Sequence, residues 1–183
     1  ITILDSYMTV GEKCLPEAHF TAQELYAAMR RGDRVSTSQA SVYERREHYQ
    51  SVLQRYPRVL YLCVGSVFTG NYSVALEWKK TNDPSDRFTV LDTQAASGRL
   101  AILVVATACF ALRTRDAEAV IRFARENAAR CREYVFLDKL QYLAAGGRLS
   151  RGSAIFGDML HMKPVISPLA EGAKKVGVVR NQA

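Results

Sequence analysis

The chain has 183 residues, of which 48% are hydrophobic and 23% charged, and its formal net charge at pH 7 is +7. These proportions are typical of an ordinary soluble globular protein, large enough for one generous domain or two small ones. The longest apolar run, Leu100 to Leu112, is too short to span a bilayer, so we expect no stable membrane insertion. The positive residues are interleaved with Glu and Asp on predicted helices, and no nucleic-acid-binding motif accompanies them, so nucleic acid is not an expected partner.

Two capping boxes, each a Ser or Thr with Glu three residues later, organise the first part of the chain. The segment between the two predicted helices, RVSTSQAS, is polar and is predicted as a loop. The predicted elements are a strand that turns at Gly11, a helix from Thr21 to Gly32, and a helix from Ser41 to about Arg55.

Apolar runs and helical patterns then alternate. The predicted elements are the strand RVLYLCVG, a helix from about Asn71 to Lys80, the strand RFTVLDT, and a helix from about Arg99 to Leu112 that is buried on nearly all sides. An amphipathic helix with Asp116 near its start follows. This alternation predicts an α/β fold with a parallel sheet wrapped by helices, in a Rossmann-like three-layer arrangement.

The pattern changes near residues 130–133. The strand EYVFLD, the short helix KLQYLAA and the helical segment SAIFGDMLHM precede two strands, KPVISPL and KVGVVR, joined by the turn AEGAKK. We therefore expect an α/β ligand-binding domain over residues 1–131 and part of a second α/β domain over residues 132–183.

The residues that usually carry chemistry are scattered. The three histidines are isolated, and neither a metal-binding motif, a nucleophile motif nor a nucleotide-binding glycine motif occurs, so the sequence predicts no enzyme, metal or cofactor. The four cysteines are far apart, and Cys63 and Cys109 lie inside apolar runs. We expect both to be small core residues in a reducing compartment, which predicts a cytoplasmic protein.

Two polar segments each lead into a predicted helix: STSQAS, residues 36–41, and GSVFTGN, residues 65–71. Ligands of parallel α/β sheets bind at the carboxyl ends of strands, and hydroxyls and free N–H groups at helix N-termini suit an anion. Neither segment offers the Arg or Lys expected for a polyphosphate, so a carboxylate is the better candidate. The alternative, that Ser41 and Thr69 only cap helices, stays open at this point.

Five segments of the chain match, in order, the pattern of the DegV family of bacterial fatty-acid-binding proteins, which the sequence resembles over nearly its whole length. They are STSQAS, SVFTGNYSVA, VLDTQAASGRLAILVVATA, FLDKLQYLAAGGRLS and GDMLHMKPVISPLAEG. The resemblance implies the EDD fold, with a long-chain fatty acid buried between two α/β domains and its carboxylate bound by hydroxyls.

Carried over residue by residue, the resemblance assigns the carboxylate to Thr37 and Thr69 and implies a lining of Ser38, Ser66, Gly70 and Asn71. It also implies a non-enzymatic role, in which the protein presents the fatty acid to a fatty-acid kinase. Arg148, in the Gly-Gly-Arg segment, is the residue expected to dock that kinase, although a turn with a solvated arginine would give the same pattern.

The sequence departs from the family pattern at Ala40, at Asn71 and near Gly98. Both ends of the pattern, an N-terminal strand and a C-terminal stretch with a histidine, are missing, so we expect a fragment or one part of a longer polypeptide. The alternative function is that of a regulatory or partner-binding DegV-like remnant that retains no lipid.

Overall fold

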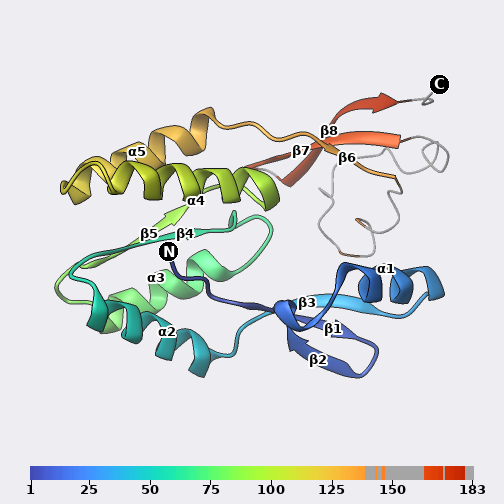
Figure 1. Ribbon diagram of the computed structural model, residues 1–183, viewed down its shortest axis with the longest axis horizontal. Coiled ribbons are helices and arrows are strands. Elements are labelled where there is room, and N and C mark those ends of the chain that lie inside the picture. Colours follow the sequence, from blue (N-terminus) through green and yellow to red (C-terminus); the bar gives the residue numbers. More distant parts are fainter. Residues whose placement is uncertain (139–142, 144–145, 147–162, 171, 180–183) are drawn as a thin grey trace. The chain divides into compact units, whose positions relative to one another are not determined.

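The structure is a computed structural model that describes residues 1–138, 143, 146, 163–170 and 172–179. The chain forms two compact units, residues 1–59 and residues 60–183, whose elements are labelled in Figure 1. We describe each unit by itself. The domain ranges expected from the sequence, 1–131 and 132–183, stay a prediction.

Unit 1 is an antiparallel sheet with helices. Strand β1 pairs with both other strands, which gives the order β2-β1-β3. The elements are β1 (Ser6–Val10), β2 (Lys13–Pro16), the 3-10 helix η1 (Glu17–His19), α1 (Ala22–Arg31), β3 (Val35–Gln39) and α2 (Val42–Arg55). Gly11, with a φ of 60°, makes the predicted turn between β1 and β2.

Both capping boxes are confirmed. The Thr21 hydroxyl accepts from the Glu24 N–H at 3.2 Å, and the Glu24 carboxylate accepts from the Thr21 N–H at 2.8 Å. Ser41 and Glu44 repeat this pair of hydrogen bonds at the start of α2. Helix α1 ends at Gly32, whose φ of 87° is left-handed, as the sequence predicted.

The predicted loop RVSTSQAS, residues 34–41, is wrong for residues 35–39, which form strand β3. Thr37 lies opposite Met8 and Ser38 opposite Tyr7 in the antiparallel ladder with β1. The segment is a strand because its backbone pairs with β1. This pairing joins segments that are far apart in the sequence, so the polar local sequence does not predict it. Only Ala40 and the capping residue Ser41 connect β3 to α2.

A hydrogen bond from the Tyr7 hydroxyl to the Glu44 carboxylate joins β1 to α2. The hydrogen bonds that Glu44 accepts, from Ser41 first and then from Tyr7, lower the pKa of its carboxyl below the ordinary value. The same contact raises the pKa of Tyr7. Glu44 therefore stabilises unit 1 as a carboxylate.

The pKa of Glu44 predicts a contribution to acid unfolding. A carboxyl with a lowered pKa in the folded state stabilises fully above its unfolded value of 4.5 and loses that contribution as the pH falls through the folded pKa. We expect Glu44→Gln to lose less stability than the wild type between pH 7 and acid pH, measured by urea unfolding followed by circular dichroism. Glu47→Gln, at an exposed position of the same helix, is the control and should behave as the wild type. Parallel acid curves for Glu44→Gln and the wild type would contradict the prediction.

Unit 2 contains two sheets and three helices. Its elements are β4 (Val59–Cys63, whose first residue ends unit 1), α3 (Asn71–Asn82), β5 (Phe88–Asp92), α4 (Ser97–Ala111), α5 (Ala117–Arg130), β6 (Val135–Phe136), β7 (Lys163–Leu169) and β8 (Gly172–Val179). Strand β4 pairs with β5, and the three later strands form an antiparallel sheet in the order β6-β7-β8. The predicted segments KLQYLAA, apart from Leu143, and SAIFGDMLHM lie outside the described residues.

The turn predicted between the last two strands, AEGAKK, is too long. Strand β8 already begins at Gly172, and Lys174 and Lys175 pair with Ser167 and Ile166 of β7. Exposed lysines are common on edge strands, where they oppose pairing with a further strand. In the sequence alone, the same polar residues are typical of a turn.

The core of unit 2 surrounds Phe88 on β5. Its ring stacks on Tyr61 of β4 at 6.0 Å and meets Trp78 of α3 edge-on at 5.5 Å. Cys63 is buried nearby, as predicted, and burial raises the pKa of its thiol to about 12, so the thiol stays protonated and inert.

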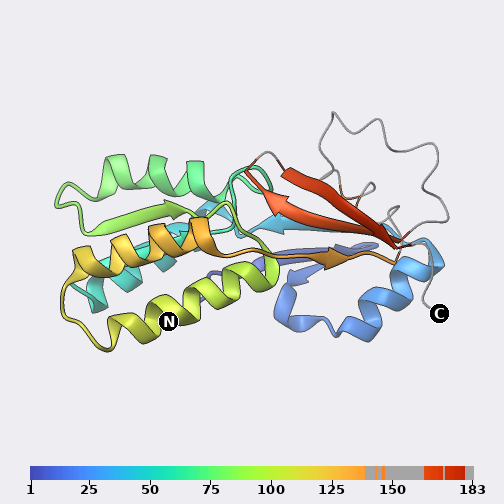
Figure 2. The ribbon, with the colours of Figure 1, turned by 90° about the horizontal axis from the view of Figure 1, so that it is seen from above.

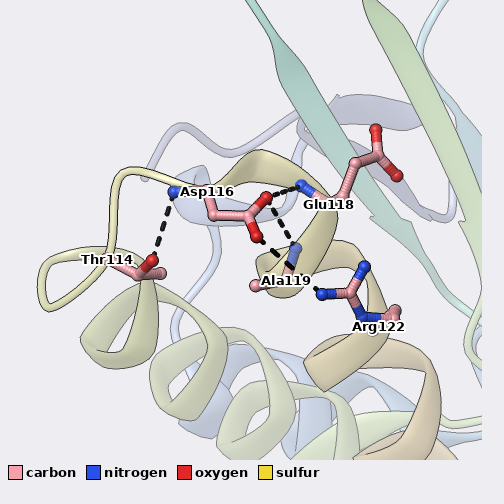
Figure 3. Close-up of polar contacts among 5 residues, drawn as sticks. All are labelled: Thr114, Asp116, Glu118, Ala119 and Arg122. Carbon is pink, nitrogen blue, oxygen red and sulfur yellow. Dashed lines mark hydrogen bonds and ion pairs between the residues drawn. The ribbon is translucent and has the colours of Figure 1, made fainter.

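Asp116 is the N-cap residue of helix α5, near the start of the helix as the sequence predicted. Its carboxylate accepts from the N–H groups of Glu118 at 2.9 Å and Ala119 at 3.1 Å, as Figure 3 shows. Arg122, one turn further on, lies 3.8 Å from the same carboxylate. The Thr114 hydroxyl accepts from the Asp116 N–H at 3.1 Å. The turn between α4 and α5 is thus fixed by local polar contacts.

The prediction that the apolar helix is buried on nearly all sides is wrong. Helix α4 is buried along one face, at Arg99, Leu103 and Thr107, and it lies beside α5 in both views (Figures 1 and 2). The opposite face is exposed at four residues: Ile102, Val105, Cys109 and Leu112. Composition reports how apolar a helix is but not how many of its faces the chain covers. The predicted burial of Cys109 fails for the same reason.

Candidate functional site

The carboxyl ends of β4 and β5 lie side by side. The Gly65 N–H donates to the Ala95 carbonyl at 2.8 Å, and the Thr93 hydroxyl donates to the Cys63 carbonyl at 2.6 Å. Because the segments that follow both strands meet, the two strands run parallel, with α3 as their crossover helix. This confirms the predicted parallel α/β arrangement and places two loops at the edge where ligands of such sheets bind. They are the β4–α3 loop, residues 64–70, and the β5–α4 loop, residues 93–96.

Gly65 allows the two loops to touch. A Cβ at this position would lie 3.0 Å from both Cα and the carbonyl carbon of Gln94, and 3.2 Å from the Ala95 nitrogen. These neighbours are backbone atoms, which cannot turn aside as a flexible side chain can. The close approach therefore requires glycine.

Ser66 links the β4–α3 loop to the end of β5. Its N–H donates to Asp92 Oδ1 at 3.0 Å and its hydroxyl to Asp92 Oδ2 at 2.6 Å. The same carboxylate accepts from the Gln94 N–H at 3.1 Å. The Ser66 proton is thus directed at a protein carboxylate. The role of Ser66 in lining a ligand stays a prediction, and its contact with Asp92 is a structural role that the sequence did not suggest.

Thr69 lies at the start of helix α3. Its hydroxyl oxygen accepts from the Asn71 N–H at 3.3 Å, which leaves the hydroxyl proton to donate elsewhere. The N-cap residue by position is Gly70, which has no side chain to cap the helix, and the Ser73 hydroxyl donates to the Gly70 carbonyl at 3.0 Å. Thr69 therefore satisfies one N–H group of the helix and keeps one donor.

The N-terminus of α3 also differs electrostatically from those of α1, α2 and α5. Each of these three helices has an acidic residue in its first turn and a side chain that caps it, whereas the first turn of α3 has no acidic residue. The positive end of the α3 dipole is thus not neutralised by a carboxylate of its own first turn.

Thr37 and Ser38 lie in the other compact unit, on strand β3. Both residues are exposed, and the Thr37 side chain forms no hydrogen bond with any residue that the structure describes. Adjacent residues of a strand point to opposite faces, so Thr37 and Ser38 cannot both face one ligand. If Thr37 binds a head group, Ser38 points away from it.

Of the other predicted features, Arg148 lies outside the described residues. Among the residues that the structure does describe, no group of three or more His, Cys, Asp or Glu is placed to hold a metal ion. In the same part of the chain, every helix is too short or too polar to cross a lipid bilayer.

Sequence reasoning placed Gly65 in a candidate segment but foresaw no packing role for it, and it missed Asp92 and Gln94 as parts of this edge. Gln94 has a φ of 52°, a left-handed backbone that is uncommon outside glycine. The available signal was positional, since Gly65 and Asp92 stand at the ends of two predicted parallel strands. Nothing in the sequence signals the left-handed Gln94.

The Gly65 contact predicts a sharp sensitivity to one added methyl group. We expect Gly65→Ala to lower the free energy of unfolding by about 1–3 kcal/mol, because the added Cβ forces the two loops apart. Urea unfolding followed by Trp78 fluorescence would measure it. Gly177→Ala is the control, since a Cβ there would meet only Val165, at 3.8 Å. Equal stabilities of the two variants would contradict the prediction.

The comparisons with known proteins agree with this geometry. A family model described as "Uncharacterised protein, DegV family" matches residues 1–183. A DegV domain-containing protein of Caldanaerobacter subterraneus is 30% identical over 160 residues, which cover 87% of this chain and 57% of that protein. One from Streptococcus pyogenes is 31% identical over 179 residues, which cover 91% of this chain and 58% of that protein. The chain thus spans little more than half the length of these relatives.

Solved structures show the same fold. A fatty-acid-binding DegV family protein from Thermus thermophilus matches with a TM-score of 0.85 at 24% identity, covering 97% of this chain and 64% of that one. DegV from Bacillus subtilis, described as a fatty acid binding protein, matches with a TM-score of 0.82 at 20% identity, covering 98% of this chain and 64% of that one. A stearic-acid-binding protein from Eubacterium ventriosum matches with a TM-score of 0.82 at 21% identity, covering 99% and 64%. At these identities the likeness establishes the fold.

Proposed function

The chain belongs to the DegV family, and we propose that it binds a long-chain fatty acid without catalysing a reaction. The proteins of known structure that share its fold include several described as fatty-acid binders, from Thermus thermophilus, Bacillus subtilis and Eubacterium ventriosum. Their descriptions supply the ligand class, and the residues of this chain supply the chemistry that suits it.

The observation that carries the proposal is the N-terminus of α3. Thr69 accepts the first helical N–H and keeps its own proton, and the first turn brings no acidic residue of its own. A ligand carboxylate there gains a hydroxyl donor and the positive end of the helix dipole. In this proposal Gly70 leaves room for close approach of the ligand, and the Asn71 side-chain amide is a further donor.

Thr37 is the second proposed hydroxyl. Its side chain is exposed and has no hydrogen-bond partner among the described residues, so it is available to a ligand. Neutral hydroxyls fix the direction of a carboxylate, while most of the affinity comes from the acyl chain, at about 0.8 kcal/mol per buried methylene. The proposal that Ser38 and Ser66 line the ligand is weaker. Ser38 points to the opposite face of the strand from Thr37, and the Ser66 hydroxyl already donates to Asp92.

We further propose that the bound carboxylate is presented to a fatty-acid kinase, with Arg148 at the docking surface, in a cytoplasmic setting. These points rest on the family resemblance alone. The competing function is a regulatory or partner-binding one without lipid, and the departure at Asn71, in the segment TGN, is the observation that favours it.

The test of the proposed function is denaturing extraction of the purified protein followed by mass spectrometry of the released small molecules. We expect close to one long-chain fatty acid per chain. A protein that is empty, and that also fails to take up added oleate, would refute lipid binding and favour the regulatory alternative.

The two hydroxyls give a sharper prediction. We expect Thr37→Ala and Thr69→Ala each to weaken oleate binding about tenfold or more, and the double variant to lose co-purifying lipid, because a hydrogen bond to a charged group contributes about 1.5–3 kcal/mol. Isothermal titration with oleate would measure the change.

Two exposed hydroxyls serve as matched controls. Ser36→Ala changes β3 beside Thr37, and Thr81→Ala changes the far end of α3, about 15 Å from its start. Both should bind as the wild type does. Unchanged lipid content in the double variant would refute the assignment of Thr37 and Thr69.

A further inference from the structure

Arg99, in the first turn of α4, is a buried cation that contacts three separate segments of unit 2. Its side chain is only 6% exposed. Nη1 donates to the Gln94 carbonyl at 3.1 Å and to the Pro168 carbonyl of β7 at 3.3 Å, and Nη2 donates to the Ala128 carbonyl at 2.5 Å. The guanidinium therefore joins the β5–α4 loop to the C-terminal turn of α5 and to the second sheet.

Backbone carbonyls alone satisfy this cation among the described residues. Burying a charge is costly unless it is well hydrogen-bonded, and Nε of Arg99 is left without a partner in the described part of the chain. Ala128 contributes one of the last four carbonyls of α5, at the negative end of that helix, which favours a cation. The fixed fork of a guanidinium can serve several carbonyls at set angles, which the point charge of a lysine cannot.

A second contact holds the same turn of α4. Glu133, beyond the end of α5, accepts from the Arg99 N–H through Oε1 at 3.3 Å. No side chain caps α4 at its N-cap residue, Ala96, so this distant carboxylate supplies the negative charge that α1, α2 and α5 take from their own first turns. The start of α4 is thus held from both its backbone and its side chain.

The loop held in this way is strained. Gln94 and Ser97 have φ values of 52° and 41°, and such left-handed conformations in residues other than glycine persist only where the surroundings enforce them. Gln94 is also the residue whose backbone Gly65 touches. The hydrogen bond that the Gln94 carbonyl accepts therefore affects the position of the β4–α3 loop, which contains Thr69.

From these contacts we propose that Arg99 is a positioning residue for the fatty-acid carboxylate: it fixes the Gln94 backbone, against which Gly65 packs, and thereby fixes the loop that presents Thr69. The inference rests on the proposed function, since it names a residue that supports the same site without touching the ligand. It also gives the β6-β7-β8 sheet a part in the site, through the Pro168 carbonyl.

The experiment compares Arg99→Lys with Arg122→Lys, an arginine on the exposed side of α5, in two measurements. The first is amide hydrogen exchange without ligand. We expect the Gly65 amide, which donates to Ala95, to exchange at least tenfold faster in Arg99→Lys, while the Val120 amide of α5 keeps its wild-type rate. The second is the Kd for oleate, which we expect to rise at least tenfold. Arg122→Lys should leave both unchanged.

A third variant separates positioning from general destabilisation. Phe123→Leu disturbs the stack of Phe123 on Phe110 of α4, at 4.4 Å, and touches neither loop. If it raises the oleate Kd and the Gly65 exchange rate as much as Arg99→Lys does at equal loss of stability, the positioning role is refuted. An unchanged Gly65 exchange rate in Arg99→Lys refutes it as well.

The ligand-free measurement distinguishes this inference from the proposed function. A wild type that fails to bind oleate overturns the proposed function, and with it the site that Arg99 would serve, whatever the exchange rates show. If Arg99→Lys does not fold, Arg99→Gln replaces it, because it removes the buried charge and the guanidinium fork and keeps a neutral amide donor. Faster Gly65 exchange and weaker oleate binding in Arg99→Gln support the proposal, and wild-type values of either refute it.

Discussion

The backbone of Gly65 touches the backbone of Gln94 and Ala95, and the candidate site of unit 2 is arranged around that contact. The parallel pairing of β4 and β5 brings the two loops to one edge, but only a residue without a side chain lets them meet. Once they meet, Ser66 reaches Asp92, and Thr69 is placed at the start of α3. The position of the proposed head-group ligand thus follows from a packing constraint between two stretches of backbone.

Negative charge is distributed over the helix N-termini in a way that fits this site. Helices α1, α2 and α5 receive it from their own first turns, and α4 receives it from Glu133. Helix α3 receives a neutral hydroxyl instead. A ligand carboxylate would supply the negative charge that the N-terminus of α3 lacks. The helix dipole and the Thr69 hydroxyl would then bind it, so the proposal needs no lysine or arginine beside Thr69. A polyphosphate carries more charge than a carboxylate, and the β4–α3 loop offers no lysine or arginine to pair with it.

The sequence predicted most elements of the fold, since their signals are local. A capping box spans four residues, and a strand that ends in small polar residues is visible in a short window. The errors fall where contacts with distant segments determine the structure. Pairing with β1 makes a strand of residues 35–39, and the packing of α4 leaves Ile102 and Val105 exposed. In the site, Thr69 and its loop were visible as a motif. The role of Arg99 was not visible in the sequence. Its partners at residues 94, 128 and 168 accept its hydrogen bonds through backbone carbonyl groups, which every residue has.

The wide separation of these contacts along the chain also has a kinetic consequence. The capping boxes of α1 and α2 join residues three positions apart, so these helices can form in the first microseconds of folding. Ser66 and Asp92 are 26 residues apart, and Arg99 and Pro168 are 69 apart, so their contacts require the closure of much longer loops. Loop-closure entropy alone favours the caps forming first, the β4–β5 contact next and the Arg99–Pro168 contact last. If Arg99 positions the β4–α3 loop as proposed, that loop reaches its final position in a chain emerging from the ribosome only after β7 has been synthesised.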